Sequence, residues 1–206
     1  MSRQTLGDTI EKAISSLPPE HVTLAEIRDL VGKDGLMILT AFLTLVFMIP
    51  VSIPGVSTVF GAGILLIGIS RLFHRDLWLP HMVAKRTISS DKLRGALQRS
   101  LKWFRKMEKF SKPHRLPKLT SPALDVINHL ALVLGAILLM APFGLIPFSN
   151  TIPAVALLFF AIGFLQRDGV CILLGHLANI LTIVYFAVLI GGGGVVIKRL
   201  WDRYVG

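Results

Sequence analysis

Charged side chains are scarce in this sequence, and cysteine is almost absent from it. Only 17% of the 206 residues are charged, against about 25% in an ordinary soluble domain. The single cysteine, Cys171, cannot form an intramolecular disulfide, which excludes a disulfide scaffold. Because 53% of the residues are hydrophobic and many lie in long uncharged runs, the composition argues against a disordered chain or an ordinary soluble enzyme. It favours an integral membrane protein.

Acidic side chains are missing from the longest apolar runs. No Asp or Glu lies between residues 35 and 73, or between residues 127 and 167. Membrane enzymes that act on sugar or polyprenyl phosphates need clustered acids to hold a divalent ion. The sequence also lacks GxSxG, HExxH and P-loop motifs, and its Cys and His residues do not have metal-ligand spacing. We therefore expect no enzymatic activity, no metal and no cofactor.

Positive charge is abundant but confined to one segment. Residues 74–122 hold thirteen Lys and Arg against three Asp and Glu, which accounts for the whole net charge of +10. Apolar runs on both sides argue against nucleic-acid binding, and the positive-inside rule places this segment in the cytoplasm. Within it, residues 90–110 predict a basic amphipathic helix lying on an anionic membrane surface. Its apolar face consists of Leu93, Leu97, Leu101 and Phe104.

The alternation of apolar and charged runs predicts an all-α, polytopic membrane protein. The chain begins with a cytoplasmic helical cap, in which residues 23–26 match a helix capping box. The five expected segments are the cap (1–34), membrane repeat 1 (35–74), a basic linker with the amphipathic helix (75–122), membrane repeat 2 (123–169), and a long C-terminal transmembrane helix with a basic tail (170–206).

Prolines interrupt both membrane repeats near their middles. In the first, residues 36–49 would form a helix about 21 Å long, shorter than the hydrocarbon core of about 30 Å. Such a helix either continues, bent, through its proline or returns as a re-entrant hairpin. The helix breaks are formed by Pro50, Pro54 and Gly55 in the first repeat and by Pro142, Pro147 and Pro153 in the second.

The two membrane repeats align at a constant offset of 92 residues without a gap. A shared proline, a shared polar cap and a closing Arg-Asp pair are hard to obtain by chance. We therefore interpret the repeats as duplicated helix–break–helix units that superpose about a pseudo-symmetry axis. The matched positions are Pro50 with Pro142, Ser57 with Ser149, and Arg75-Asp76 with Arg167-Asp168.

A helix that restarts after a break has unpaired N–H groups and a partial positive charge at its start. Two such starts on a common polar cavity would bind an anion within the membrane. In the simpler alternative these residues only cap their helices, and Arg167 and Asp168 form a helix-end ion pair. The candidate binding residues are Ser57, Thr58, Ser149, Asn150 and Thr151 at the two starts, with Arg71, Arg167 and Asp168 nearer the surface.

The C-terminal segment raises a conflict of topology. Its polar residues His176 and Asn179 lie on one face and predict interhelical hydrogen bonds. Its basic tail favours a cytoplasmic C-terminus, whereas two hairpins that each return to their starting side would place that terminus outside. Either the second repeat crosses an odd number of times, or the last helix bends at residues 191–194.

Several short motifs occur together in this chain. They are Thr23-Leu24-Ala25-Glu26, Ile49-Pro50-Val51-Ser52-Ile53-Pro54-Gly55 followed by Ser57-Thr58, Trp78-Leu79-Pro80, and Pro147 with Asn150-Thr151-Ile152-Pro153-Ala154 and Arg167-Asp168-Gly169. Over roughly residues 5–200 the chain resembles the bacterial ExoD family, named for exopolysaccharide synthesis. The resemblance implies a multi-pass protein of the inner membrane linked to exopolysaccharide production or export. It brings no catalytic residues, so it implies a pathway and not a mechanism.

Two functions remain open at this point. In the first, the protein is a small transporter or translocase for an anion such as a polyprenyl phosphate or a glycan-linked intermediate. In the second, it is a non-transporting scaffold or regulator of a polysaccharide synthase, docked through residues 90–110. Anionic membrane lipids, synthase or export proteins and a second copy of the chain are the expected partners.

Overall fold

The computed structural model describes residues 11, 14–45, 47, 55–73, 87–91, 94–95, 98, 101, 114–143 and 146–204. Over these residues the chain is mainly helical, which confirms the all-α class. Its elements are β1 (His21–Thr23), α2 (Leu24–Leu45), α3 (Val56–Leu72), β2 (Thr87–Ser89), α6 (Pro122–Leu139), α7 (Thr151–Gln166) and α8 (Gly169–Tyr204). The two membrane repeats correspond to the pairs α2–α3 and α6–α7.

A short antiparallel pair of strands joins the N-terminal segment to the linker, which the sequence does not predict. β1 and β2 pair with His21 opposite Ser89 and Thr23 opposite Thr87. The N–H of Ser90 extends the pairing by donating to the carbonyl of Glu20 at 3.1 Å. Strands of three residues carry too little alternation of polar and apolar side chains to be recognised in a sequence.

α2 begins at the capping box that the sequence predicts. The N–H of Thr23 donates to Glu26 Oε2 at 2.8 Å, and the N–H of Glu26 donates to Thr23 Oγ1 at 3.2 Å. The bonds from the Thr23 backbone and hydroxyl hold the pKa of Glu26 below its ordinary value. From there α2 runs as one helix through residues 34 and 35, the expected boundary of the cytoplasmic cap.

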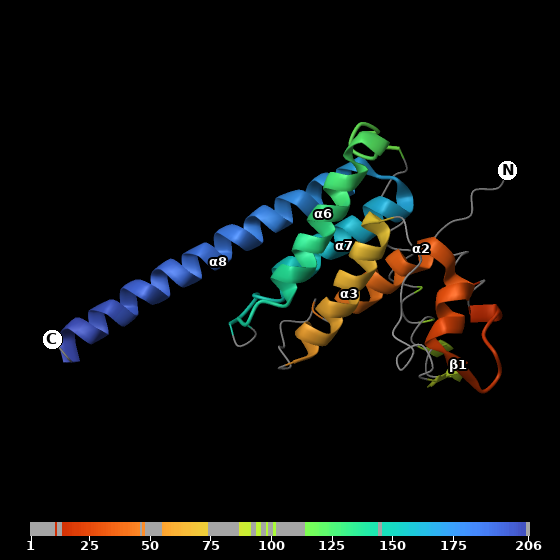
Figure 1. Ribbon diagram of the computed structural model, residues 1–206, viewed down its shortest axis with the longest axis horizontal. Coiled ribbons are helices and arrows are strands. Elements are labelled where there is room, and N and C mark those ends of the chain that lie inside the picture. Colours follow the sequence, from red (N-terminus) through yellow and green to blue (C-terminus); the bar gives the residue numbers. More distant parts are fainter. Residues whose placement is uncertain are drawn as a thin grey trace.

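Helices α2, α3, α6 and α7 form a closed four-helix ring, in which each helix packs against two others (Figure 1). α3 packs mainly on α6 and α2 mainly on α7, so each hairpin is held chiefly by the other. Gly61 faces Met140 beyond the end of α6, whereas Gly68 faces Val133 nearer its start. α3 and α6 are therefore antiparallel, as in an up-down-up-down bundle.

The interior of the four-helix ring is apolar. All four helices contribute fully or almost fully buried side chains to one cluster, and α7 is buried on most of its surface. Tight packing of this kind leaves few voids larger than a water molecule. The largest of these buried side chains are Met37 of α2, Ile64 and Ile67 of α3, Leu132 and Leu139 of α6, and Leu157 and Phe160 of α7.

α8 packs along α7 and α6 and then continues well beyond the ring (Figure 1). Its 36 residues make a helix about 54 Å long at 1.5 Å per residue. It is uninterrupted through residues 191–194. The bend at these glycines, one of the two resolutions of the topology conflict, is therefore not present.

Apolar side chains are exposed in stripes along three helices. On α6 the exposed stripe includes Val126, Leu130 and Ile137, and on α3 it includes Val59 and Phe73. α8 exposes a third such face between Leu173 and Ile190, and contiguous apolar surface of this kind marks contact with lipid or protein. In the part of the chain that the structure describes, residues 122–139 and 169–192 are long and apolar enough to cross a membrane.

Little of the basic linker is described. Leu101, from the predicted amphipathic helix, packs against a core cluster that includes Ala41 of α2 and Ala161 of α7. At this position the apolar face of the helix meets the protein. The other residues predicted for that face, Leu93, Leu97 and Phe104, lie outside the described residues, as do the break prolines Pro50 and Pro54.

Candidate functional site

The start of α3 has a different cap from the one that the sequence suggests. The N-cap residue is Gly55, with φ of 83°, in the left-handed region that glycine adopts without strain. Ser57 and Thr58 therefore lie inside the first turn, Ser57 buried and Thr58 exposed. Gly55 both breaks the first repeat and sets the start of its second helix.

The start of α7 lies where the sequence places it, with Asn150 at the N-cap, but the Asn150 side chain makes no capping hydrogen bond. The hydroxyl of Ser149 instead lies 2.7 Å from the carbonyl oxygen of Phe143 and 2.8 Å from that of Ile146, and donates toward them. Ser149 is buried and Thr151 is half-buried. The Ser149 hydroxyl thus bonds to carbonyls of its own loop, the one between α6 and α7.

Both helix starts lie at one end of the four-helix ring, which we call the break end (residues 55–58, 140–143 and 146–151). Gly61 against Met140 brings the start of α3 to the loop that leads into α7. α8 holds this loop, because the Tyr185 hydroxyl donates to the carbonyl of Pro147 at 2.6 Å. Five of the candidate residues are therefore gathered at the break end, on two different helices.

The opposite end, where α3 and α7 finish and α6 and α8 begin, contains a buried ion pair. We call it the basic end (residues 71–73, 114–125 and 166–171). Asp168 has no exposed surface, and its carboxylate accepts from Arg115 Nε at 3.2 Å and contacts Nη2 of the same side chain. This hydrogen bonding raises the pKa of Arg115 above its ordinary value, so the guanidinium stays charged.

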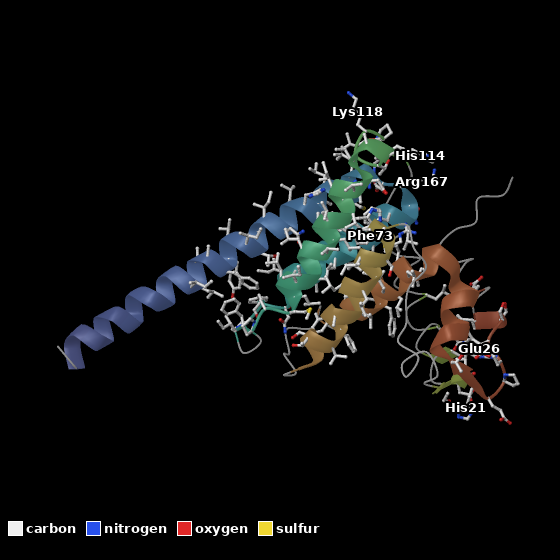
Figure 2. All side chains as sticks on the ribbon, viewed as in Figure 1. His21, Glu26, Phe73, His114, Lys118 and Arg167 are labelled. Atoms are coloured by element: carbon white, nitrogen blue, oxygen red, sulfur yellow. The ribbon has the colours of Figure 1, made fainter. Side chains whose placement is uncertain are left out.

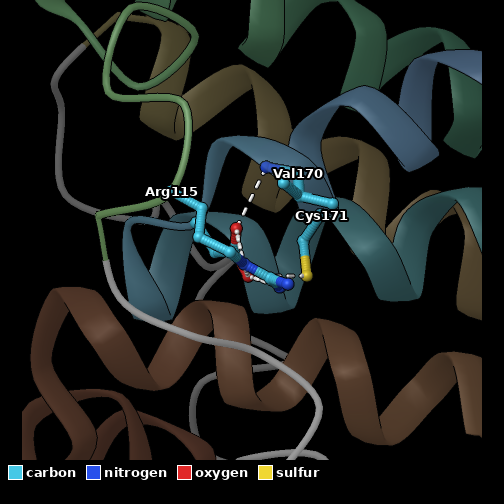
Figure 3. Close-up of polar contacts among 4 residues, drawn as sticks. Arg115, Val170 and Cys171 are labelled. Carbon is cyan, nitrogen blue, oxygen red and sulfur yellow. Dashed lines mark hydrogen bonds and ion pairs between the residues drawn. The ribbon is translucent and has the colours of Figure 1, made fainter.

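Asp168 also caps α8 (Figure 3). Its Oδ1 accepts from the N–H of Val170 at 3.0 Å, and its Oδ2 accepts from the thiol of Cys171 at 3.4 Å. A carboxylate at this position satisfies a free N–H and is favoured by the helix dipole. The anion-binding start of α8 is thus already occupied by a carboxylate of the chain itself.

The loop before α6 and the turn before α8 are joined by two backbone hydrogen bonds. The N–H of His114 donates to the carbonyl of Arg167 at 3.2 Å, and the N–H of Gly169 donates to that of Arg115 at 2.8 Å. His114, Leu116 and Arg167 all have positive φ, between 46° and 65°. Such strained residues persist only where surrounding contacts over-determine them.

The other candidate residues at the basic end are Arg71 and Arg167. Arg71 is half-buried in the last turn of α3, and Arg167 is exposed. Figure 2 shows Arg167, His114, Lys118 and Phe73 at this same end. Asp168 pairs with Arg115 rather than with its neighbour Arg167. The sequence alone could not single out Arg115, because it is one of thirteen cations in its segment and lies 53 residues from its partner.

Hydrogen bonds between α6 and α8 confirm the expectation for His176 and Asn179. His176 Nε2 lies 2.9 Å from Asn128 Oδ1, and Asn179 Nδ2 donates to the carbonyl of Ala131 at 2.8 Å. Since Asn128 Nδ2 donates to the carbonyl of Leu119 at 2.6 Å, Asn128 Oδ1 is an acceptor and His176 the donor. Among the described residues, no three His, Cys, Asp or Glu gather as metal ligands would.

Comparison with known proteins places this chain in a family. The model of the family described as "Exopolysaccharide synthesis, ExoD" matches residues 6–188. The chain is 43% identical over 189 residues to Protein ExoD of Rhizobium meliloti, and the aligned region covers 91% of this chain and 78% of that protein. It is 29% identical over 188 residues to an uncharacterized protein of Synechocystis sp., covering 88% and 86% of the two chains. No solved structure matches it. The chain therefore belongs to the ExoD family of exopolysaccharide synthesis proteins.

Proposed function

We propose that this protein acts in exopolysaccharide synthesis as a non-enzymatic, integral protein of the inner membrane that scaffolds or regulates the synthesis or export machinery. The observation that carries the membrane placement is the distribution of side chains. Apolar stripes are exposed on α3, α6 and α8, whereas Thr40, Asn128 and Asn179 are buried and bonded to backbone carbonyls. Polar groups inside and apolar groups outside are what a bilayer requires.

The lengths of the helices support hairpins that enter the membrane from one side and return to that side. α3, α6 and α7 have 17, 18 and 16 residues, or about 24–27 Å at 1.5 Å per residue, against a hydrocarbon core of about 30 Å. α2 is about 33 Å long, but only its residues 35–45 form an apolar stretch. Of the two candidate spans, α6 falls just short of that thickness and α8 exceeds it. We propose that the two hairpins begin and end on the cytoplasmic side, with the break end deep in the membrane, and that α8 crosses it completely. This arrangement places the C-terminus outside, so the cytoplasmic C-terminus that the basic tail favoured is given up.

The pattern of packing supports an internal duplication. If α2–α3 and α6–α7 are copies related by a two-fold axis, the contact of α3 with α6 must be repeated by α7 with α2. These are the two principal contacts between the hairpins. Because both hairpins run from the basic end to the break end and back, the axis would lie along the membrane normal. Two copies in the same orientation are consistent with the ungapped alignment of the two repeats at an offset of 92 residues.

The interior of the four-helix ring favours a scaffold over a transporter. A translocated anion needs polar groups along its path, whereas the described side chains between the break end and the basic end form an apolar cluster. A charge in such surroundings is strongly disfavoured. Beside this cluster, His176 of α8 bonds to Asn128 of α6, and the side-chain amide nitrogens of Asn128 and Asn179 donate to backbone carbonyls.

Anion binding at the break end is the second candidate function. It is favoured by one observation, the gathering of Ser57, Ser149 and Asn150, all buried, at one end of the molecule. In a low-dielectric site a charge-assisted hydrogen bond contributes about 1.5–3 kcal/mol. A polyprenyl phosphate or a glycan-linked intermediate would then be held by backbone N–H groups and these side chains.

One pair of variants separates the two functions. Ser57→Ala and Asn150→Ala, each in the full chain, would be tested for restoring exopolysaccharide output to a deletion strain, with Thr120→Ala in the loop at the basic end as the control. The scaffold predicts normal output from all three. The anion site predicts a loss confined to Ser57→Ala and Asn150→Ala, with polyprenyl-phosphate binding about tenfold weaker, since 1.4 kcal/mol is one decade.

Membrane placement has its own test. In a Cys171→Ser background, a cysteine at Lys118 and another at Thr58 would be exposed in turn to a membrane-impermeant maleimide. We expect Lys118→Cys to react in inverted membrane vesicles and not in intact cells, and Thr58→Cys to react in neither. Labelling of Lys118→Cys in intact cells would refute the cytoplasmic placement of the basic end.

A further inference from the structure

The exposed apolar stripes of the helices run into the basic end. Phe73, which closes α3, is 66% exposed, and Val126 in the first turns of α6 is 50% exposed. Leu116, in the loop that precedes α6, is 48% exposed. An apolar surface therefore continues up to the level at which the helices finish and the cations begin.

Cations from two separate segments lie at this level. Lys118 precedes α6 and Arg167 precedes α8, and both side chains are exposed (Figure 2). Arg71 adds a half-buried cation in the last turn of α3. Arg115 does not count toward this surface charge, because the buried carboxylate of Asp168 balances it.

The break end is different in charge. In the stretches that form it, residues 55–58, 140–143 and 146–151, there is no Lys, Arg, Asp or Glu. Within residues 55–73, 114–143 and 146–192, every Lys and Arg lies at the basic end, together with the acids Asp125 and Asp168. This end also meets the exposed apolar side chains. A phosphate-bearing headgroup above an acyl chain presents the complementary arrangement.

We propose that Lys118 and Arg167, with Arg71 behind them, form a binding surface for the headgroups of anionic phospholipids, whose acyl chains lie along the stripes that end at Phe73 and Val126. This inference rests on the membrane placement proposed above. A lipid fits this surface better than a free phosphate, because the cations are exposed beside apolar side chains rather than enclosed in a pocket. The surface holds the basic end at the cytoplasmic leaflet and so fixes the depth of the bundle.

The test compares two variants that lose equal charge. The full chain in detergent would be titrated with phosphatidylglycerol or with phosphatidylcholine of identical acyl chains, and bound lipids counted by native mass spectrometry. Lys118→Gln/Arg167→Gln removes two cations from the proposed surface, and Arg199→Gln/Arg203→Gln removes two from the far part of α8. Circular dichroism and size-exclusion chromatography would show that both variants are folded.

We expect wild type to prefer phosphatidylglycerol, and the Lys118→Gln/Arg167→Gln variant to lose about fivefold in affinity per cation, hence about 25-fold in all. The control variant should keep the preference, and inorganic phosphate at equal concentration should not displace the lipid. Equal affinity for the two lipids, equal losses in the two variants, or displacement by inorganic phosphate would each overturn the proposal. Failure to enter phosphatidylcholine bilayers at all would instead refute the membrane placement.

Discussion

The buried pair of Arg115 and Asp168 leads to a quantitative prediction. Removing one partner of a buried ion pair destabilises a protein by about 3–5 kcal/mol, because the other charge stays buried without compensation. Arg115 is one-third exposed and Asp168 is not exposed at all, so the two substitutions are unequal. In Arg115→Ala the carboxylate stays buried without its guanidinium, although it still accepts from the Val170 N–H and the Cys171 thiol. In Asp168→Asn the guanidinium can turn toward water.

Because Arg115 is partly exposed, solvent screens the interaction, and we expect Arg115→Ala to lower the free energy of unfolding by less than that range, about 2–3 kcal/mol. Asp168→Asn should lower the free energy of unfolding by about 1 kcal/mol, because an amide oxygen can still accept from the Val170 N–H and cap α8. In the double variant no buried charge remains. Its loss should therefore be at least 1 kcal/mol smaller than the sum of the single losses.

Thermal unfolding of the purified protein in a mild detergent would measure these differences. At about 2–4 °C per kcal/mol for a chain of this length, Arg115→Ala should lower Tm by roughly 4–12 °C. Arg167→Ala is the matched control, because Arg167 is exposed and adjacent to the same carboxylate. Additive losses in the double variant, or equal shifts for Arg115→Ala and Arg167→Ala, would refute the assignment of Arg115 as the compensating charge.

Three other predictions concern separate parts of the fold. Gly169→Ala should destabilise the protein by 2 kcal/mol or more in the same assay, because its Cβ would lie 2.2 Å from a backbone carbonyl oxygen, whereas Gly191→Ala meets nothing within 4 Å. Asn179→Leu should cost about 1 kcal/mol or more by removing the hydrogen bond to α6, measured as a lower Tm. The lowered pKa of Glu26 contributes stability that is present above its ordinary pKa of 4.5 and is lost as pH falls through the lower folded value. An acid titration of helix content should show this loss in wild type and not in Glu26→Gln.

Local features of the sequence were sufficient to predict the capping box, the helical class and the placement of a helix start at Thr151. Each depends on residues within a turn or two of one another, where spacing alone determines which groups can meet. The prediction failed at the start of α3, because Ser57 is a good cap by residue type but Gly55 has the backbone conformation that the turn needs.

Features that depend on contacts between distant segments were not predictable. Nothing near Asp168 in the chain identifies Arg115, and nothing near His21 identifies Ser89. His176 and Asn179 were recognisable as polar residues in an apolar helix, but not their partners Asn128 and Ala131. In a bilayer such groups must find a partner on another helix, yet their position along the chain does not say which.

The cross-packing of the two hairpins has a consequence for biosynthesis. α2 is complete at Leu45, but α7, its principal neighbour, is complete only at Gln166. At about 5–20 residues per second the ribosome needs roughly 6–24 s to make the intervening 120 or so residues. During that interval the first hairpin must be accommodated by lipid or by the insertion machinery, with its inner face uncovered. Chain synthesis, and not the closing of the ring, would then set the pace of folding in the cell.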